Sequence, residues 1–343
     1  MKEMKKNKQT MVLFILCLLI PIAFFISINA GYTSIGLKDI IRIITGGGTL
    51  KENLIIMEFR MPRIIIAMLV GAGFSLSGCV LQGITKNPLA DPGLMGINAG
   101  AGIVVIVFIM LSGTLSFTSI FALPIMSMIG AVITGTIIYK LSLQKNIGIR
   151  PISLVLNGVA IQAGINAVMT LIVIKLDESQ HEFLVKWQAG SIWSSNWKFV
   201  IALFPWIILG FIVLMLMADK MDVLIMGDEI STGLGIAVVK EKRRLLFTAI
   251  ALAASSVAIS GSISFVGLIA PHLSRKLVGA KHTVLIPTCA MVGALLVLAA
   301  DTIARTIIEP SEIPTGIVVS ILGSPYFLFL MLKTRKVSNN SNS

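Results

Sequence analysis

The stretch GCVLQGITKNPLADPGLMGINAGAG, residues 78–102, decides the fold class of this chain. Long apolar runs flank it, and two prolyl turns, Asn87-Pro88 and Asp91-Pro92, interrupt the hydrophobic sequence between two candidate membrane-spanning helices. Glycine and asparagine then recur through the start of the second helix. A helix that faces only lipid needs neither feature, because broken backbone at membrane depth is tolerated only where it is buried in protein or lines a watery path. The stretch therefore indicates a pathway through the membrane as well as an anchor in it.

The composition of the 343-residue chain agrees with an integral membrane protein. Only 13% of its residues are charged and 56% are hydrophobic, whereas about 25% are charged in soluble domains. The net charge is +12, but the charged residues lie between apolar runs and form no basic face. We therefore expect membrane lipid and no nucleic acid as a partner. The three cysteines and three histidines lack disulfide or metal-ligand spacing, so neither a metal site nor a cofactor is expected.

The sequence predicts an all-α polytopic membrane protein with about ten transmembrane helices in one domain, residues 1–343. A spanning helix needs roughly 20 apolar residues. The 35-residue run 245–279 is too long for one span, and Ser260-Gly261-Ser262 is its natural break, with a single tilted helix as the alternative. The predicted spans are 11–30, 62–84, 93–111, 119–141, 152–174, 198–218, 245–262, 263–279, 283–304 and 313–332.

The basic residues orient these spans. With the N-terminal segment 1–10 in the cytoplasm, 19 of the 28 lysines and arginines fall in inner segments and the other 9 in outer ones, as the positive-inside rule requires. Both termini of this multi-pass membrane protein are then expected to be cytoplasmic. The longest cytoplasmic loop is 219–244, and the polar tail 338–343 is predicted to be disordered.

Three arginines are candidates for contacting a partner outside the membrane. The sequence FRMPR, residues 59–63, places Arg60 and Arg63 at the start of a helix, and Arg305 is predicted to lie on the same outer face. Interfacial anchoring is the alternative. Because arginine forms bidentate pairs with carboxylates, three outer arginines favour a docking site for acidic side chains.

The loop DKMDVLIMGDEISTGLGIAVVKEKRR, residues 219–244, is the candidate for contacting a cytoplasmic partner. It is predicted to form two short helices with a tight glycine bend, where larger side chains would clash. A solvated loop is the alternative, but apolar residues in a loop that no lipid covers usually mark a partner. The residues predicted to contact the partner are Gly227, Asp228, Glu229, Gly233, Leu234 and Gly235.

Polar and turn residues at membrane depth are candidates for a pathway or gate. Each asparagine within a helix could instead join neighbouring helices. The candidates are Asn87, Pro88, Asp91, Asn98 and Asn157.

Other classes of activity lack their signatures. The sequence has no Walker A motif, and Gly46-Gly47-Gly48 lacks the GK[ST] ending of a phosphate-binding loop. No nucleophile–base constellation is evident, so we expect no enzyme. Few carboxylates lie in mid-membrane, where an ion-coupled carrier usually places one.

Six segments of the chain resemble the FecCD/BtuC-type permeases, the membrane subunits of ABC importers for ferric siderophores, haem and cobalamin. The likeness runs from about Gly36 to Lys333, with the polar Asn157 as a minor departure. The segments are RMPRIIIAMLVGAGFSLSGCVLQGITKNPLADPGLMGINAGAG, LNGVAIQA, MGDEISTGLGIAV, ISFVGLIAPHLSRKLVG, ADTIAR and IPTGIVVSILGSPYFLFLM.

The resemblance implies the type II ABC importer permease fold and a location in the cytoplasmic membrane of a bacterium. It also implies an assembly of two permease subunits, the same or homologous, with two cytoplasmic ATPases and an extracellular substrate-binding protein or lipoprotein. The positions matching 227–235 would contact the ATPase, and those matching Arg60, Arg63 and Arg305 would meet acidic residues of the binding protein. The expected substrate is a ferric siderophore, with haem or cobalamin as alternatives. Two alternatives from other functional classes are an ion-coupled secondary transporter and a membrane scaffold or receptor.

Overall fold

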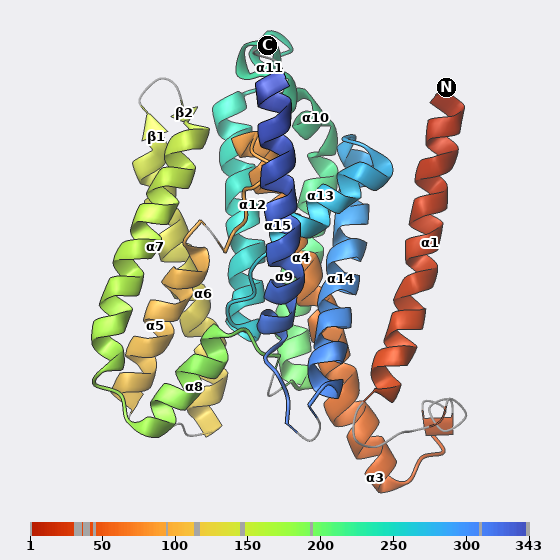
Figure 1. Ribbon diagram of the computed structural model, residues 1–343, viewed down its shortest axis with the longest axis vertical. Coiled ribbons are helices and arrows are strands. Elements are labelled where there is room, and N and C mark those ends of the chain that lie inside the picture. The colour runs from red at the N-terminus through yellow and green to blue at the C-terminus, as the bar shows by residue number, and fades with distance from the viewer. Residues whose placement is uncertain are drawn as a thin grey trace.

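The computed structural model describes residues 2–30, 36, 42–43, 46–93, 95–112, 117–144, 148–192, 195–308 and 311–340. Within these ranges the chain is a bundle of helices with one short antiparallel hairpin (Figure 1). The elements are α1 (Lys2–Asn29), α3 (Leu50–Asn53), the π-helix η1 (Leu54–Arg60), α4 (Met61–Thr85), α5 (Ile97–Ser112), α6 (Phe117–Ser142), β1 (Leu143–Gln144), β2 (Gly148–Ile149), α7 (Pro151–Val173), α8 (Glu178–Gln188), α9 (Trp197–Leu216), α10 (Ala218–Met226), α11 (Asp228–Gly233), α12 (Val238–Ser260), α13 (Val266–Val278), α14 (His282–Thr306) and α15 (Thr315–Asn340).

The polytopic all-α prediction is confirmed, and each of the ten predicted spans coincides with a helix. Among the described residues, seven helical segments are long and apolar enough to cross a membrane, and α5 and α15 contain shorter apolar stretches. The tenth, α13, has 13 residues and is about 20 Å long, less than the roughly 30 Å of a hydrocarbon core. The seven long segments lie in α1, in α3 to α4, and in α6, α7, α9, α12 and α14.

The predicted break within 245–279 is confirmed, and the single tilted helix is wrong. Helix α12 ends at Ser260 and α13 begins at Val266. Gly261 has φ +65° and lies against the carbonyl of Trp187 at the end of α8. Glycine is the residue that adopts this left-handed backbone without a steric cost. The break brings the segment between α12 and α13 to the end of α8, where the Ser262 backbone N–H donates to the Trp187 carbonyl at 3.4 Å.

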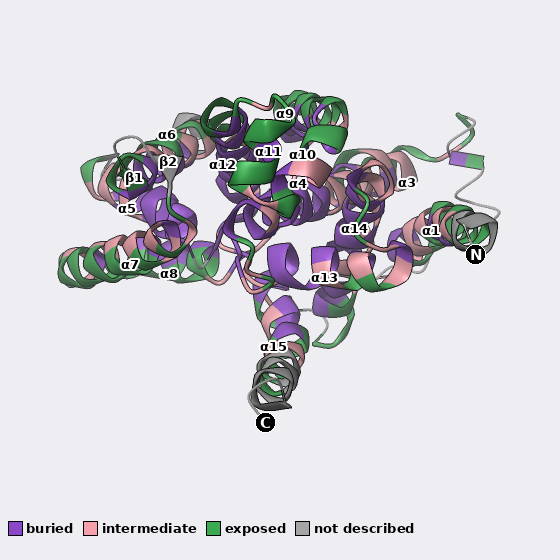
Figure 2. Cartoon of the chain, turned by 90° about the horizontal axis from the view of Figure 1, so that it is seen from above, coloured by how far each residue is buried: buried purple, intermediate pink, exposed green. Residues whose placement is uncertain are grey.

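Helix α4 lies at the centre of the bundle. It contacts α9, α12, α13 and α14, and Figure 2 shows buried residues concentrated around it, whereas α7 at the edge is largely exposed. Its glycines permit this packing, since small residues let helix backbones approach closely. Gly71 lies against the backbone of Gly293, and Gly78 lies against that of Gly267.

We expect Gly78→Ala to destabilise the protein much more than Gly83→Ala on the same helix. A methyl group at Gly78 would overlap the carbonyl of Gly267, whereas at Gly83 the nearest atom is the flexible Met221 Cε at 4.0 Å. Overpacking of this kind costs about 1–3 kcal/mol. Thermal unfolding of the purified variants in detergent measures the difference, and equal unfolding temperatures would contradict the close packing of α4 on α13.

The polar segments gather at two ends of the bundle. Figure 1 shows both termini, the β1–β2 hairpin, α10 and α11 at one end, called here the α11 end, and α3 and α8 at the opposite α3 end. Two details differ from the sequence prediction. Strands β1 and β2 pair between α6 and α7, and α15 continues to Asn340, into the tail predicted to be disordered. A helix that has nucleated gains a hydrogen bond with each added residue, which explains the extension.

Helix α8 is a non-spanning helix between the predicted spans 152–174 and 198–218. A capping box starts it, because the Asp177 side chain accepts from the backbone N–H of Gln180 while the Gln180 side chain accepts from that of Asp177. The hydrogen bond from the Gln180 backbone, followed by that from the Ser179 hydroxyl, lowers the pKa of Asp177. The cap fixes the direction of α8, whose far end carries Trp187 and Gln188.

Candidate functional site

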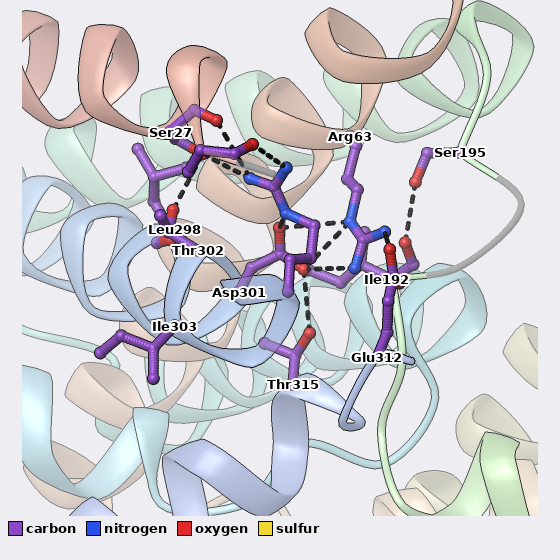
Figure 3. A network of polar contacts seen from close by, with 12 residues as sticks. Ser27, Arg63, Ile192, Ser195, Leu298, Asp301, Thr302, Ile303, Glu312 and Thr315 are labelled. Atoms are coloured by element: carbon purple, nitrogen blue, oxygen red, sulfur yellow. Dashed lines mark hydrogen bonds and ion pairs between the residues drawn. The ribbon is translucent and has the colours of Figure 1, made fainter. Parts of the chain in front are cut away.

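A fully buried carboxylate, Asp301, organises the arginines at the α3 end. From α4, Arg63 donates to it through Nε, 3.2 Å from each carboxylate oxygen, and through Nη2, 3.0 Å from Oδ1. From α14, Arg305 Nε donates to Oδ2 at 3.1 Å, and the Thr315 hydroxyl donates to Oδ1 at 3.0 Å. Figure 3 shows Arg63 reaching Asp301 on one side and Glu312 on the other. One carboxylate therefore joins α4, α14 and the start of α15.

The other two arginines also hold the C-terminal end of α1. Arg60 Nη1 donates to the Ile28 carbonyl at 2.6 Å, and Arg305 Nη2 donates to the carbonyl and the hydroxyl of Ser27 at 3.2 and 2.8 Å. The last carbonyls of a helix lack partners within it, and a cation there also complements the helix dipole. Arg60 and Arg305 are 9% and 8% exposed. The prediction that the three arginines share one end is consistent with these contacts, but two of them are buried in this network.

The two ion pairs of Arg63 differ in their surroundings. Its side chain is 14% exposed, that of Asp301 is 0% exposed, and that of Glu312 is 48% exposed. Removing one partner from a buried pair costs about 3–5 kcal/mol, whereas an exposed pair contributes roughly 0–1 kcal/mol. The Asp301 pair is therefore structural, whereas the Glu312 pair, with Nη1–carboxylate distances of 3.0 and 2.8 Å, contributes little to stability.

The sequence analysis did not identify Asp301 and Glu312 as members of this site. The spacing of Asp301 and Arg305, four residues apart on one helix, was the available signal. Glu312 had no comparable signal, because its contact with Arg63 spans 249 positions.

At the α11 end, the predicted pair of short helices is present as α10 and α11. Asp228 and Glu229 occupy the first turn of α11. Lys242 of α12 donates to both oxygens of Asp228 at 2.7 Å, and the buried Ser231 hydroxyl donates to the carbonyls of Val223 and Gly227 at 2.9 and 2.6 Å. These bonds fasten α11 to α10 and α12. The loop is therefore a defined surface feature of the bundle.

The same loop presents an apolar surface. Leu224 is buried, whereas four large apolar side chains are between 41% and 63% exposed. They share the tip of the loop with the exposed Glu229, Gly233 and Gly235. We call these four residues the loop patch: Ile225, Met226, Ile230 and Leu234.

The glycines of the loop have different roles. Gly227 and Gly235 have φ of +128° and +79°, and a Cβ at either would meet nothing within 4 Å. The predicted steric clash at the bend is therefore wrong, and the left-handed backbone is what favours glycine at Gly235. Gly233 is the last residue of α11 and also lies in open space.

A polar cavity of about 360 Å³ lies between α5, α7, α8 and the 261–265 segment. Asn98 lines it and donates to the Ser262 hydroxyl at 3.1 Å, while its Oδ1 is buried without a hydrogen-bond partner among the described residues. A second cavity of about 370 Å³ shares Gln188, Ser262 and Ser264 with the first and extends along α15 to Ser320 and Ser324. Hydroxyl and amide groups therefore run from the interior of the bundle to α15.

Sequence reasoning missed the polar face of α7. Gln162, Asn166 and Thr170 line the first cavity. Their spacing of four residues places them on one helix face, and this repeat within an apolar span was the signal that could have identified them.

The other pathway candidates have structural contacts. The Asn87 side chain accepts from the backbone N–H of Leu89 at 2.9 Å, beside the exposed Pro88. Asp91 is 2% exposed and accepts from the backbone N–H of Gly93 at 2.8 Å. Asn157 donates to the Ser142 hydroxyl at 3.0 Å, joining α7 to α6, and is not among the residues that line either cavity. Asn98 thus lines the cavity directly, and the other four shape turns or helix contacts.

This chain is similar in sequence and structure to known proteins. A model of the FecCD transport family matches residues 18–333. The iron(3+)-hydroxamate import system permease protein FhuG of Bacillus subtilis (strain 168) is 43% identical over 96% of this chain and 98% of its own length. The hemin transport system permease protein HmuU of Yersinia pestis is 35% identical over 94% and 95%. A metal-chelate type ABC transporter solved in an inward-facing conformation has a TM-score of 0.83 and 31% identity, covering 94% of this chain and 99% of that one.

Proposed function

Because this chain belongs to the FecCD transport family, we propose that it is the permease subunit of an ABC importer that carries a ferric siderophore across the bacterial cytoplasmic membrane. The observation that carries the proposal is the 43% identity, over nearly the full length of both chains, with an iron(3+)-hydroxamate import permease. That relative favours a hydroxamate-type chelate, and haem is the second candidate because a hemin permease is also similar over nearly the whole chain.

In this proposal the α11 end faces the cytoplasm, with both termini, and the loop patch and Glu229 receive the ATPases. Exposed apolar groups rimmed by charge are typical of a protein interface. The bonds of Lys242 and Ser231 support this role, because a loop fastened to α12 passes a displacement on to the bundle.

The α3 end then faces outward and receives the substrate-binding protein. Arg63 is the partly exposed member of the arginine group, and it contacts the acidic partner directly. Arg60 and Arg305 hold α1 and keep the surroundings of Arg63 in place.

The polar cavities line part of the transport route, which a second permease subunit completes. Amide and hydroxyl groups hydrogen-bond a chelate in transit without holding it tightly. Among the described residues, no group of three or more His, Cys, Asp or Glu side chains is placed to bind a metal ion. Iron therefore crosses inside its chelate.

The test is uptake by the complete importer, this chain with its second permease, ATPases and binding protein, reconstituted in vesicles. We expect ATP-dependent accumulation of radiolabelled iron supplied as a ferric trihydroxamate, and none when an ATPase subunit lacks its catalytic carboxylate. If the importer takes up only haem or cobalamin, that compound replaces the ferric siderophore as the proposed substrate. Uptake driven by an ion gradient without ATP would overturn the proposal in favour of a secondary transporter.

A further inference from the structure

We infer that Glu312 takes the place of a carboxylate of the substrate-binding protein. It forms an ion pair with Arg63 until the docking protein displaces it. The inference rests on the proposed function, in which an acidic partner docks at the α3 end. It assigns to this exposed glutamate the role of setting how tightly that partner is held.

The guanidinium of Arg63 is shared between two carboxylates. Nε and Nη2 donate to the buried Asp301, and Nη1 donates to both oxygens of Glu312 at 3.0 and 2.8 Å (Figure 3). An incoming carboxylate needs the same short, charge-assisted bonds. The group on Arg63 that such a carboxylate can use is therefore already engaged by Glu312.

Burial decides which of the two carboxylates can leave. Asp301 is 0% exposed and also accepts from Arg305 and Thr315, so releasing it would strand charges inside the protein. The Glu312 side chain is 48% exposed and can rotate into water, where solvation replaces its ion pair at little cost. Exchange at Nη1 alone leaves the bonds that join α4 and α14 intact.

The exchange also keeps the charges balanced. Arg63 faces two carboxylates before docking, and it faces two after docking if a partner carboxylate replaces Glu312. The partner gains only the difference between its own bond and that of Glu312, so docking is weaker than a free arginine would allow. Such weakening suits a binding protein that must be released after each delivery.

The test measures binding of the substrate-binding protein to the full importer in lipid nanodiscs. We expect Glu312→Gln to tighten binding by about two- to fivefold, the range of one exposed ion pair. Glu182→Gln is the matched control, because Glu182 is an exposed carboxylate of α8 at the same end, paired with Lys186. We expect this control to bind as wild type does.

The background variant is Arg63→Lys, which retains a cation beside Asp301 but loses the fork that serves two carboxylates. It should weaken docking, and adding Glu312→Gln to it should no longer tighten binding. If Arg63→Lys weakens docking while Glu312→Gln alone binds no more tightly than wild type, the inference is overturned and the docking proposal stands. If Glu182→Gln tightens binding equally, the effect comes from the change in net charge alone, and the inference is also overturned. If Arg63→Lys and Glu312→Gln both bind as tightly as the wild type, Arg63 takes no part in docking and the docking proposal fails.

Discussion

Replacing Asp301 by alanine is expected to lower the free energy of unfolding by about 3–5 kcal/mol. The substitution leaves Arg63 and Arg305, whose side chains are only 14% and 7% exposed, without the carboxylate that they share. Their like charges would then repel at the junction of α4 and α14, and the Thr315 hydroxyl would lose its acceptor. Thermal unfolding in detergent and the amount of protein in the membrane both measure this loss.

Glu312→Gln is the control for that experiment. It removes the other carboxylate of Arg63, but from an exposed pair, so the unfolding free energy should change by less than about 1 kcal/mol. An Asp301→Ala protein as stable as the wild type would contradict the structural role of the buried carboxylate. A large loss of stability in Glu312→Gln would show that the two pairs are not distinguished by burial.

Replacing Gly235 by valine is expected to reduce ATP hydrolysis stimulated by the binding protein, and uptake with it, on the order of tenfold. The residue has φ +79°, and a left-handed backbone costs a side-chain-bearing residue about 1–2 kcal/mol. The loop can relieve this strain by moving away from the geometry that the ATPase recognises. Membrane abundance should stay near that of the wild type, because a Cβ there meets nothing within 4 Å.

Gly233→Val separates backbone strain from added bulk. Gly233 is also exposed, and a Cβ there would also meet nothing within 4 Å, but it lies in α11 and has no positive φ. We expect this variant to retain most of the stimulation. Normal uptake by Gly235→Val would show that the bend at Gly235 is not needed for coupling to the ATPase. An equal loss in both variants would show that added bulk on the loop surface, and not backbone strain, causes the loss.

The predicted helices were recognisable from the sequence because each depends on local properties. Apolar length, prolines and glycines predicted the ten helices and the break between α12 and α13, which Gly261 makes with a positive φ. The two short helices of the 219–244 loop followed from the same local patterns. The reason offered for its glycine bend was wrong, because the space around Gly235 could not be known from its neighbours in the chain.

The partners of the arginines depended on contacts between distant segments. Arg63 meets Asp301 238 positions away and Glu312 249 positions away, and Arg305 meets Ser27 278 positions away. Charge and spacing could place these arginines at one end, but they could not tell a buried ion pair from an exposed one. The polar face of α7 and the cavity beside Asn98 likewise exist only once α5, α7 and α8 pack together.

The sequence by itself therefore determined the membrane class and the order of the helices, because hydrophobic length and turn chemistry act over a few neighbouring residues. The segments that would contact partners stay a prediction. Only the tertiary structure decided that Arg60 and Arg305 hold α1 and that Arg63 also pairs with the exposed carboxylate of Glu312. The physical reason is that the strength of a charge interaction depends on burial and on the competing groups around it, and packing from the whole chain determines both.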